Sequence, residues 1–237
     1  MGRPWNERTI LLLGDEKVER LHRAHILVVG VGGVGAYAAE MLTRAGVGRI
    51  TLVDADAIQP SNINRQLPAT HQTIGMPKVE VMRERLMAIN PTLKLETRCE
   101  FLDETTIEPF LAATPYSFII DAIDSITPKA ELIATALRMK VKIVSSMGAG
   151  AKDDPTAVTT SVLSKTFNCG LAKAMRTRLK AMGVRGKLPV VFSTQPARKE
   201  SIILIEGERN KKSTSGTISY MPAIFGCHLA AYAIKQL

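Results

Sequence analysis

A chain of 237 residues, 46% hydrophobic and only 5% aromatic, is long enough for one sizeable α/β domain with an aliphatic core. Its three cysteines form no C-x-x-C pair, which excludes a disulfide framework and a zinc knuckle. The formal net charge of +9 favours a polyanionic partner, and the lack of a signal peptide favours a cytoplasmic protein. We therefore expect a single domain over residues 1–237.

The first expected element is a short amphipathic helical region over residues 8–21, which Gly14 interrupts. Its leucines are expected to pack against the domain.

Residues 26–54 follow the order strand, tight turn, helix, strand. A β-branched run ends at four glycines that open an alanine-rich helix, and a second apolar run ends at Asp54. Glycines let backbone N–H groups approach a phosphate closely, and the helix N-terminus adds the positive end of its dipole. Asp54 lies where a ribose-binding carboxylate falls in a mononucleotide-binding unit. The predicted nucleotide-binding glycines are Gly30, Gly32, Gly33 and Gly35.

Two cations and several amides follow the second strand. Arg65 lies in the segment SNINRQ and Lys78 in GMPKVE, close to the edge where open parallel sheets bind ligands. A dehydrogenase whose glycine turn already holds a pyrophosphate has no obvious need for both cations. A triphosphate attacked at its α-phosphorus does, because negative charge develops on the phosphate oxygens. The expected nucleotide ligands of this segment are Asp56, Asn62, Arg65, Gln66 and Lys78.

The remaining elements predict an α/β fold of the Rossmann type, with a mostly parallel sheet flanked by helices and shorter, antiparallel strands in the C-terminal third. The nucleotide-binding part covers about residues 20–150, and a basic, substrate-side part covers about 151–237. A loop over 57–75 precedes a helix with Pro77 in its first turn, which ends at Asn90-Pro91. Strands are expected over 93–98, 116–122, 141–146, 157–163, 190–194 and 201–206, and helices over 104–113, 128–139 and 170–182.

The chain ends in an apolar stretch of about 17 residues, shorter than the about 20 that a membrane span needs. Pro222, Gly226 and His228 interrupt it. A core helix is therefore favoured, and membrane association is not expected.

Two carboxylates, Asp121 and Asp124, follow the expected strand over 116–122. Mg²⁺ prefers one or two carboxylates together with substrate phosphates. Thr127 with Pro128 supplies a cap for the next helix, so we assign Asp124 to the metal and leave Asp121 in support.

From Pro155 to Lys199 the chain has nine Lys or Arg and no Asp or Glu. Such a stretch attracts a polyanion through counterion release, although a solvated basic helix face has the same composition. The candidate polyanion-binding residues on the expected basic helix are Lys173, Arg176, Arg178 and Lys180.

The glycine turn, the D-x-D, the S-N-x-N-R-Q, the G-x-x-K-V-E and the later DAID together resemble the adenylating domain of the ubiquitin-activating-enzyme superfamily. The resemblance covers the chain from Arg8 onward and implies a Rossmann-like domain that uses ATP and Mg²⁺ to activate a carboxylate. It further implies a homodimer in which Arg8 reaches the ATP site of the partner subunit. The assigned catalytic residues are Arg65, Lys78 and Asp124.

Within that superfamily the chain most resembles members that act on tRNA, through DAIDSITPKAELIA, LAKAMRTRLK and VFST. The activated carboxylate would then belong to a threonylcarbamoyl group on an adenosine beside the anticodon, and ring closure would expel AMP. A cysteine desulfurase or sulfur acceptor is a further partner that the resemblance suggests.

Three alternatives remain open from the sequence. A sulfur-carrier adenylyltransferase would use the same nucleotide residues on a protein C-terminus, although relatives of that kind often carry the zinc-binding cysteine pairs that this chain lacks. A nicotinamide oxidoreductase would bind NADH without turning over ATP. A nucleotide-binding sensor would hold ATP without releasing pyrophosphate. Cys169 has two lysines nearby in sequence, but an inert thiol is favoured over a thioester-forming one.

Overall fold

The computed structural model describes residues 5–204 and 213–237. A seven-stranded sheet forms its centre, with the strand order β3-β2-β1-β4-β5-β7-β6. Neighbouring strands are parallel except for β6 and β7, which are antiparallel. The strands are β1 (His25–Val29), β2 (Arg49–Val53), β3 (Lys94–Arg98), β4 (Phe118–Asp121), β5 (Ile143–Ser146), β6 (Val158–Val162) and β7 (Pro189–Ser193).

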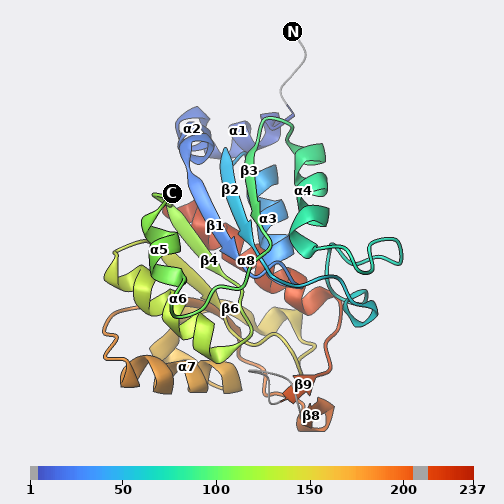
Figure 1. Ribbon diagram of the computed structural model, residues 1–237, viewed down its shortest axis with the longest axis vertical. Helices are drawn as coiled ribbons and strands as arrows, with labels where there is room; N and C mark the ends of the chain where they lie inside the picture. Colours follow the sequence, from blue (N-terminus) through green and yellow to red (C-terminus); the bar gives the residue numbers. More distant parts are fainter. Residues whose placement is uncertain (1–4, 205–212) are drawn as a thin grey trace.

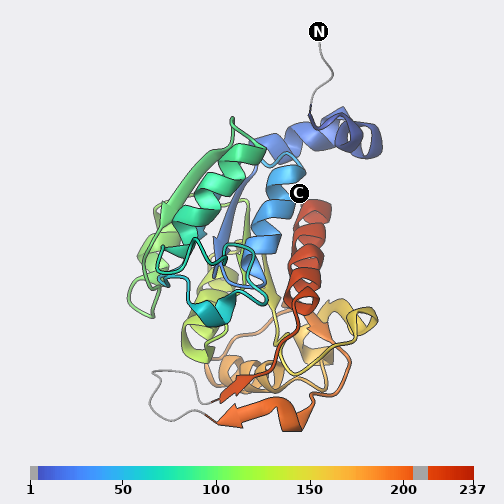
Figure 2. The same cartoon turned by 90° about the vertical axis from the view of Figure 1, so that its right-hand side faces the viewer.

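Helices cover both faces of the sheet, as its nearly continuous apolar strands require. On one face lie α3 (Gly35–Arg44), α4 (Lys78–Ile89) and α8 (Tyr220–Gln236), which Figure 2 shows side by side. On the other face lie α5 (Ile107–Ala112), α6 (Ile126–Arg138) and α7 (Gly170–Ala181). Two short helices, α1 (Glu7–Leu13) and α2 (Asp15–Arg23), precede β1 at the amino end of the strands (Figure 1).

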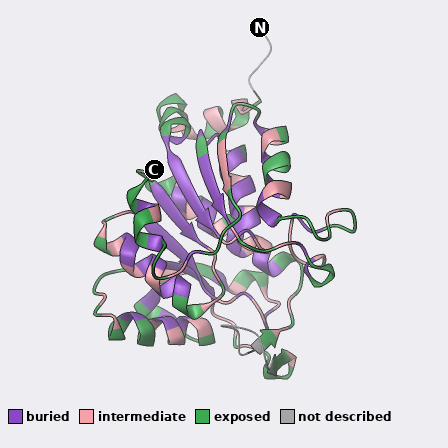
Figure 3. Ribbon diagram, viewed as in Figure 1, coloured by how far each residue is buried: buried purple, intermediate pink, exposed green. Residues whose placement is uncertain are grey.

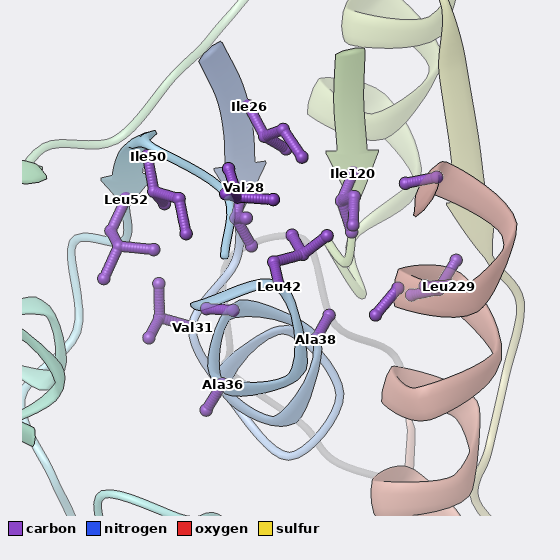
Figure 4. Packing of buried hydrophobic residues seen from close by; sticks show 14 of the residues in the cluster. Ile26, Val28, Val31, Ala36, Ala38, Leu42, Ile50, Leu52, Ile120 and Leu229 are labelled. Carbon is purple, nitrogen blue, oxygen red and sulfur yellow. The ribbon is translucent and has the colours of Figure 1, made fainter. Parts of the chain in front are cut away.

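The core is aliphatic, as the composition predicts. The central strands are buried along their whole length (Figure 3). Figure 4 shows Ile26 and Val28 of β1 facing Leu42 of α3, with Leu229 of α8 beside them. α3 and α8 approach closely because Gly226 has no side chain: a Cβ there would lie 2.5 Å from the Val34 carbonyl oxygen. The expected C-terminal core helix is confirmed. None of the helices in the described residues combines the length and hydrophobicity that crossing a bilayer requires.

The expected mostly parallel sheet is confirmed, but the C-terminal strands differ from the prediction. The strand expected over 190–194 is not a purely antiparallel one, because β7 pairs in parallel with β5 and is antiparallel only to β6. The strand expected over 201–206 is β8 (Ile202–Leu204), which forms a separate two-stranded sheet with β9 (Ser213–Ser215). Residues 205 and 206 lie outside the described part. Strand pairing depends on tertiary contacts, which the local apolar pattern does not contain.

Two local predictions were wrong. α6 begins at Ile126 with Ser125 in the capping position, so Thr127 is not its cap. The leucines of α1 do not all pack against the domain: Leu11 and Leu12 are 78% and 82% exposed. Gly14 separates α1 from α2 and adopts φ +80°, a conformation that glycine reaches without strain.

Candidate active site

The glycine turn lies between β1 and α3 at the carboxyl end of the parallel strands. Gly30 has φ +88°, and a Cβ on it would lie 2.7 Å from the Ala122 carbonyl oxygen after β4. A Cβ on Gly35 would lie only 1.8 Å from the Gly30 carbonyl oxygen. Both glycines are therefore needed for the turn to close against itself and against the β4 loop. The turn leaves backbone N–H groups and the N-terminus of α3 together at the sheet edge, an arrangement that suits a phosphate.

Asp54, directly after β2, is tied to this turn. Its Oδ2 accepts a 2.6 Å hydrogen bond from the Val31 backbone N–H, and its Oδ1 accepts one of 2.9 Å from the Asp56 N–H. Burial raises the pKa of the Asp54 carboxyl, while Lys78 and the two N–H groups oppose that rise. Each carboxylate oxygen has a second lone pair, so both can still accept from ribose hydroxyls.

Lys78 begins α4 and turns its ammonium toward the same carboxylates. Its Nζ lies 2.6 Å from Asp56 Oδ2 and 3.9 Å from Asp54 Oδ1. The Lys78 side chain is 6% exposed and that of Asp56 is 70% exposed. A lysine at a helix N-terminus opposes the helix dipole unless an anion lies close to it, and Asp56 supplies part of that negative charge. Because Asp56 faces solvent, its carboxylate can be rehydrated when a phosphate takes over the ammonium.

The segment around Arg65 packs against the glycine turn. Arg65 Nη1 donates to the Ser61 carbonyl at 2.7 Å and to Asn64 Oδ1 at 2.9 Å, both exposed bonds within its own segment. A Cβ on Gly33 would lie 3.3 Å from the Arg65 carbonyl oxygen. Asn62 is buried, and its Oδ1 accepts from the Gln59 N–H at 3.0 Å, which places it within the short 3₁₀ turn Pro60–Asn62.

Gln66 carries an unsatisfied group at this point. Its amide nitrogen would lie 3.6 Å from a Cβ on Gly32, and its Oε1 is buried without a hydrogen-bond partner among the described residues. Buried polar atoms are nearly always paired. The unpaired Gln66 Oε1 and the glycine turn beside it both fit a polar ligand such as a nucleotide.

A buried ion pair supports the loop that carries Asp124. Lys129 Nζ lies 2.9 Å from Asp121 Oδ2, and both side chains are 0% exposed. The same lysine donates to the Ile123 carbonyl at 2.9 Å, and Asp121 Oδ1 accepts from the Ile123 N–H at 3.1 Å. Ser145 of β5 adds a 2.6 Å bond to Asp121 Oδ2. The backbone on both sides of Ile123 is therefore held directly before the exposed Asp124.

Sequence reasoning named Asp121 as a supporting residue but missed Lys129. The signal was available: Lys129 stands between Pro128 and Ala130 in a run whose other members, including Leu132 and Ile133, form a buried stripe. A lysine on a buried helix face requires an anionic or polar partner. Asp121, at the end of the preceding strand, is the carboxylate that the sequence offers for that role.

The structure brings most of the predicted nucleotide ligands together at one sheet edge: the glycine turn, Asp54, Asp56, Arg65, Gln66, Lys78 and the loop of Asp124. No group of three or more His, Cys, Asp or Glu in the described chain is placed to hold a metal ion by itself. A Mg²⁺ ion at Asp124 would therefore depend on substrate phosphates for its other ligands, as this ion commonly does.

Other predicted residues lie apart from this edge. Arg8 is exposed on α1, at the opposite end of the sheet (Figure 1). Lys173, Arg178 and Lys180 are exposed on α7. Arg176 on the same helix is half-buried, and its guanidinium binds the Thr166 and Leu163 carbonyls and the Thr166 hydroxyl. A structural role is therefore visible for Arg176, and its predicted contact with tRNA stays a prediction.

This fold and this nucleotide-type site define an adenylating enzyme class. The chain belongs to the ThiF family, whose model matches residues 6–237.

Among its relatives, this chain is similar to tRNA threonylcarbamoyladenosine dehydratase of Escherichia coli (strain K12), with 38% identity over 98% of this chain and 94% of that protein. The dehydratase of Bacillus subtilis (strain 168) is 36% identical over 97% and 93%. A crystal structure of the E. coli tRNA N6-threonylcarbamoyladenosine dehydratase in complex with ATP has a TM-score of 0.88, 37% identity and coverage of 97% of this chain and 91% of that one. By contrast, the molybdopterin-synthase adenylyltransferase of Salmonella typhimurium, at 33% identity, matches over 68% of this chain and 65% of that protein.

Proposed function

We propose that this protein is an ATP-dependent tRNA threonylcarbamoyladenosine dehydratase. The observation that carries the proposal is the match of essentially the whole chain, at 36–38% identity, to two bacterial dehydratases. The molybdopterin-synthase and sulfur carrier protein adenylyltransferases among its relatives match only 68% and 48% of this chain, so tRNA is favoured as the substrate over a protein C-terminus.

In the proposed reaction the substrate carboxylate attacks the α-phosphorus of ATP in line. An acyl-oxygen-to-phosphorus bond forms, the bond to pyrophosphate breaks, and an acyl-adenylate results. A nucleophile within the same threonylcarbamoyl side chain then displaces AMP and closes a ring, which completes a net dehydration. The protein mainly positions the reactants and neutralises charge, so no enzyme cysteine takes part.

Each residue of the site has one role in this scheme. The amides of the Gly30–Gly35 turn hold the nucleotide, and Asp54 accepts from the ribose hydroxyls. Gln66 pairs its buried amide with the nucleotide, and Asn62 keeps Arg65 near the phosphates. Arg65 and Lys78 neutralise the phosphate oxygens. Lys78 breaks its ion pair with Asp56 when it binds them. Asp124 would hold Mg²⁺, which would supply positive charge to neutralise the leaving pyrophosphate.

The assembly is proposed to be a cytoplasmic homodimer. The exposed leucines of α1 supply an apolar surface for a second copy, and Arg8 on that helix would reach the other subunit's ATP site. A cysteine desulfurase or sulfur acceptor remains a proposed additional partner.

The proposed activity is tested on the modified nucleoside itself. Purified protein with ATP, Mg²⁺ and tRNA that carries threonylcarbamoyladenosine is expected to release pyrophosphate and AMP, and nucleoside mass spectrometry should show the loss of one water. Omitting ATP is the control. ATP turnover that requires a small Gly-Gly-ending protein instead of tRNA would contradict the proposal.

Neutralising the exposed cations of α7 is expected to weaken tRNA binding and to flatten its salt dependence. In the double variant Arg178→Ala, Lys180→Ala, the slope of log K against log salt should become shallower by up to about 0.9 for each phosphate that is no longer neutralised. The control is Lys142→Ala, Lys235→Ala, which removes the same charge from exposed positions near the C-terminal end of α8. Filter binding across a salt series measures both slopes, and equal slopes would count against the α7 surface.

A further inference from the structure

Phe167 is a large apolar side chain that remains 52% exposed. It lies in the short connection between the 3₁₀ turn Leu163–Lys165 and α7. A single exposed apolar residue needs no explanation in itself. The backbone around this one, however, is held by hydrogen bonds from neighbouring side chains.

Two side chains fix the segment on either side of Phe167. Arg176 of α7 donates to the Thr166 carbonyl at 3.0 Å and also binds the Thr166 hydroxyl. On the other side, Asn168 adopts φ +52° and donates from Nδ2 to the Thr194 carbonyl at 2.8 Å. A non-glycine residue in the left-handed region is uncommon and persists where its surroundings hold it. The backbone on both sides of Phe167 is therefore held in place.

A buried aromatic ring supports Phe167 from the sheet. The centroids of Phe167 and Phe192 of β7 lie 5.6 Å apart, and the rings meet edge to face at 79°. Phe192 is 2% exposed. The supported ring keeps about half of its surface open to solvent instead of folding onto the core.

This ring lies on the same sheet edge as the nucleotide site. Phe167 belongs to the same connection as Cys169, whose Sγ lies 3.6 Å from where a Cβ on Gly148 would be, just beyond β5. β5 is the neighbour of β4, which ends beside Asp124. Strands are spaced about 4.8 Å apart, so the ends of β7 and β4 are separated by about 10 Å. A separation of about 10 Å would let a nucleobase stack on Phe167 while the carboxylate attached to that base lies at the ATP phosphates.

The charge around the ring suits a polyanion. Lys165 and Lys173 precede and follow Phe167 in the sequence and are both exposed, and the stretch from Pro155 to Lys199 contains no acidic residue. Aromatic rings among cations are the combination with which proteins bind unpaired nucleotides, since bases stack on the ring and phosphates meet the cations.

We propose that Phe167 is the stacking platform for an unpaired nucleobase of the tRNA anticodon loop, either the modified adenosine or its neighbour. The inference rests on the proposed function, because it names how that substrate is recognised. Phe167 is a specificity-determining residue in this scheme and takes no part in the bond-making steps.

The test compares variants that keep or remove the aromatic face. Phe167→Ala is expected to weaken binding of an anticodon stem-loop RNA about tenfold, the loss that one stacked base typically produces, and to raise KM for tRNA more than it lowers kcat. Phe167→Tyr should restore binding because it keeps the ring. Phe167→Leu should not, although it keeps an apolar side chain. Equal binding by the Leu and Phe proteins would overturn the proposal, as would unchanged binding by the Ala variant.

A spectroscopic signal separates stacking from a general effect on the loop. The chain has one tryptophan, Trp5, so Phe167→Trp in a Trp5→Phe background reports from position 167 alone. Stacking of a base should quench its fluorescence as the stem-loop RNA is added, and RNA that binds without quenching would refute the assignment. If the wild-type protein releases no pyrophosphate with modified tRNA, the proposed function fails; if it does and the variants behave as wild type, only the role of Phe167 fails.

Discussion

The variant Arg65→Ala is expected to lose pyrophosphate release almost completely, by about 10²–10³-fold, the loss seen when one preorganised charge-stabilising donor is removed. The guanidinium makes only exposed hydrogen bonds, to Ser61 and Asn64, so the fold should survive. What the variant lacks is the cation that neutralises charge developing on the phosphate oxygens. ATP–pyrophosphate exchange in the presence of modified tRNA measures the effect, and Asp124→Ala tests the second assigned role in the same assay.

Arg83→Ala is the matched control for this variant. Arg83 is likewise an arginine with a solvent-accessible side chain, but it lies on α4 and pairs with Glu80. It should retain exchange at the wild-type rate. An Arg65→Ala protein that exchanges as fast as the Arg83→Ala protein would refute the catalytic role of Arg65.

The variant Lys129→Met is expected to lower the free energy of unfolding by about 3–5 kcal/mol, because it leaves the Asp121 carboxylate buried without its cation. Asp121 and Lys129 are both completely buried, and water cannot compensate the charge that remains. Urea unfolding should show a lower midpoint with an unchanged slope.

The double variant Asp121→Asn, Lys129→Met distinguishes the effect of an unpaired buried charge from the effect of changed side-chain packing. Removing both charges should recover part of the stability that Lys129→Met removes, since replacing a buried pair by neutral groups is often nearly neutral. If Lys129→Met costs less than about 1 kcal/mol, the pair contributes no more than an exposed one would, and its stabilising role is refuted.

The first βαβ unit, from β1 to β2, could be predicted closely because its signals are local. The glycine spacing, the apolar run before Gly30 and the carboxylate after β2 each follow from constraints within about thirty residues, as a βαβ unit requires. The structure places Asp54, Arg65 and Lys78 at the edge that these signals indicate.

The rest depends on contacts between distant segments. The direction of β7 relative to the main sheet was predicted wrongly because its parallel partner, β5, lies far earlier in the chain, with β6 and α7 between them. The sequence predicts a surface cation at Arg176, since nothing nearby in sequence shows that it binds the Thr166 segment. Lys129 is a different case, because its partner Asp121 is only eight residues away: the lysine is recognisable as buried once the apolar residues around it and that carboxylate are considered together.

The close packing of α3 and α8 has a consequence for the order in which the protein matures. The glycine turn is made early in synthesis, but its backing includes Pro222, whose Cβ lies 3.0 Å from where a Cβ on Gly33 would be, and Gly226 beside Val34. Domains generally acquire structure as units while the ribosome extends the chain from its N-terminus. A nascent chain that ends before α8 therefore has the loop without the helix that packs against it, so the site proposed to bind ATP is completed late in translation, after the α7 segment proposed to contact tRNA has emerged.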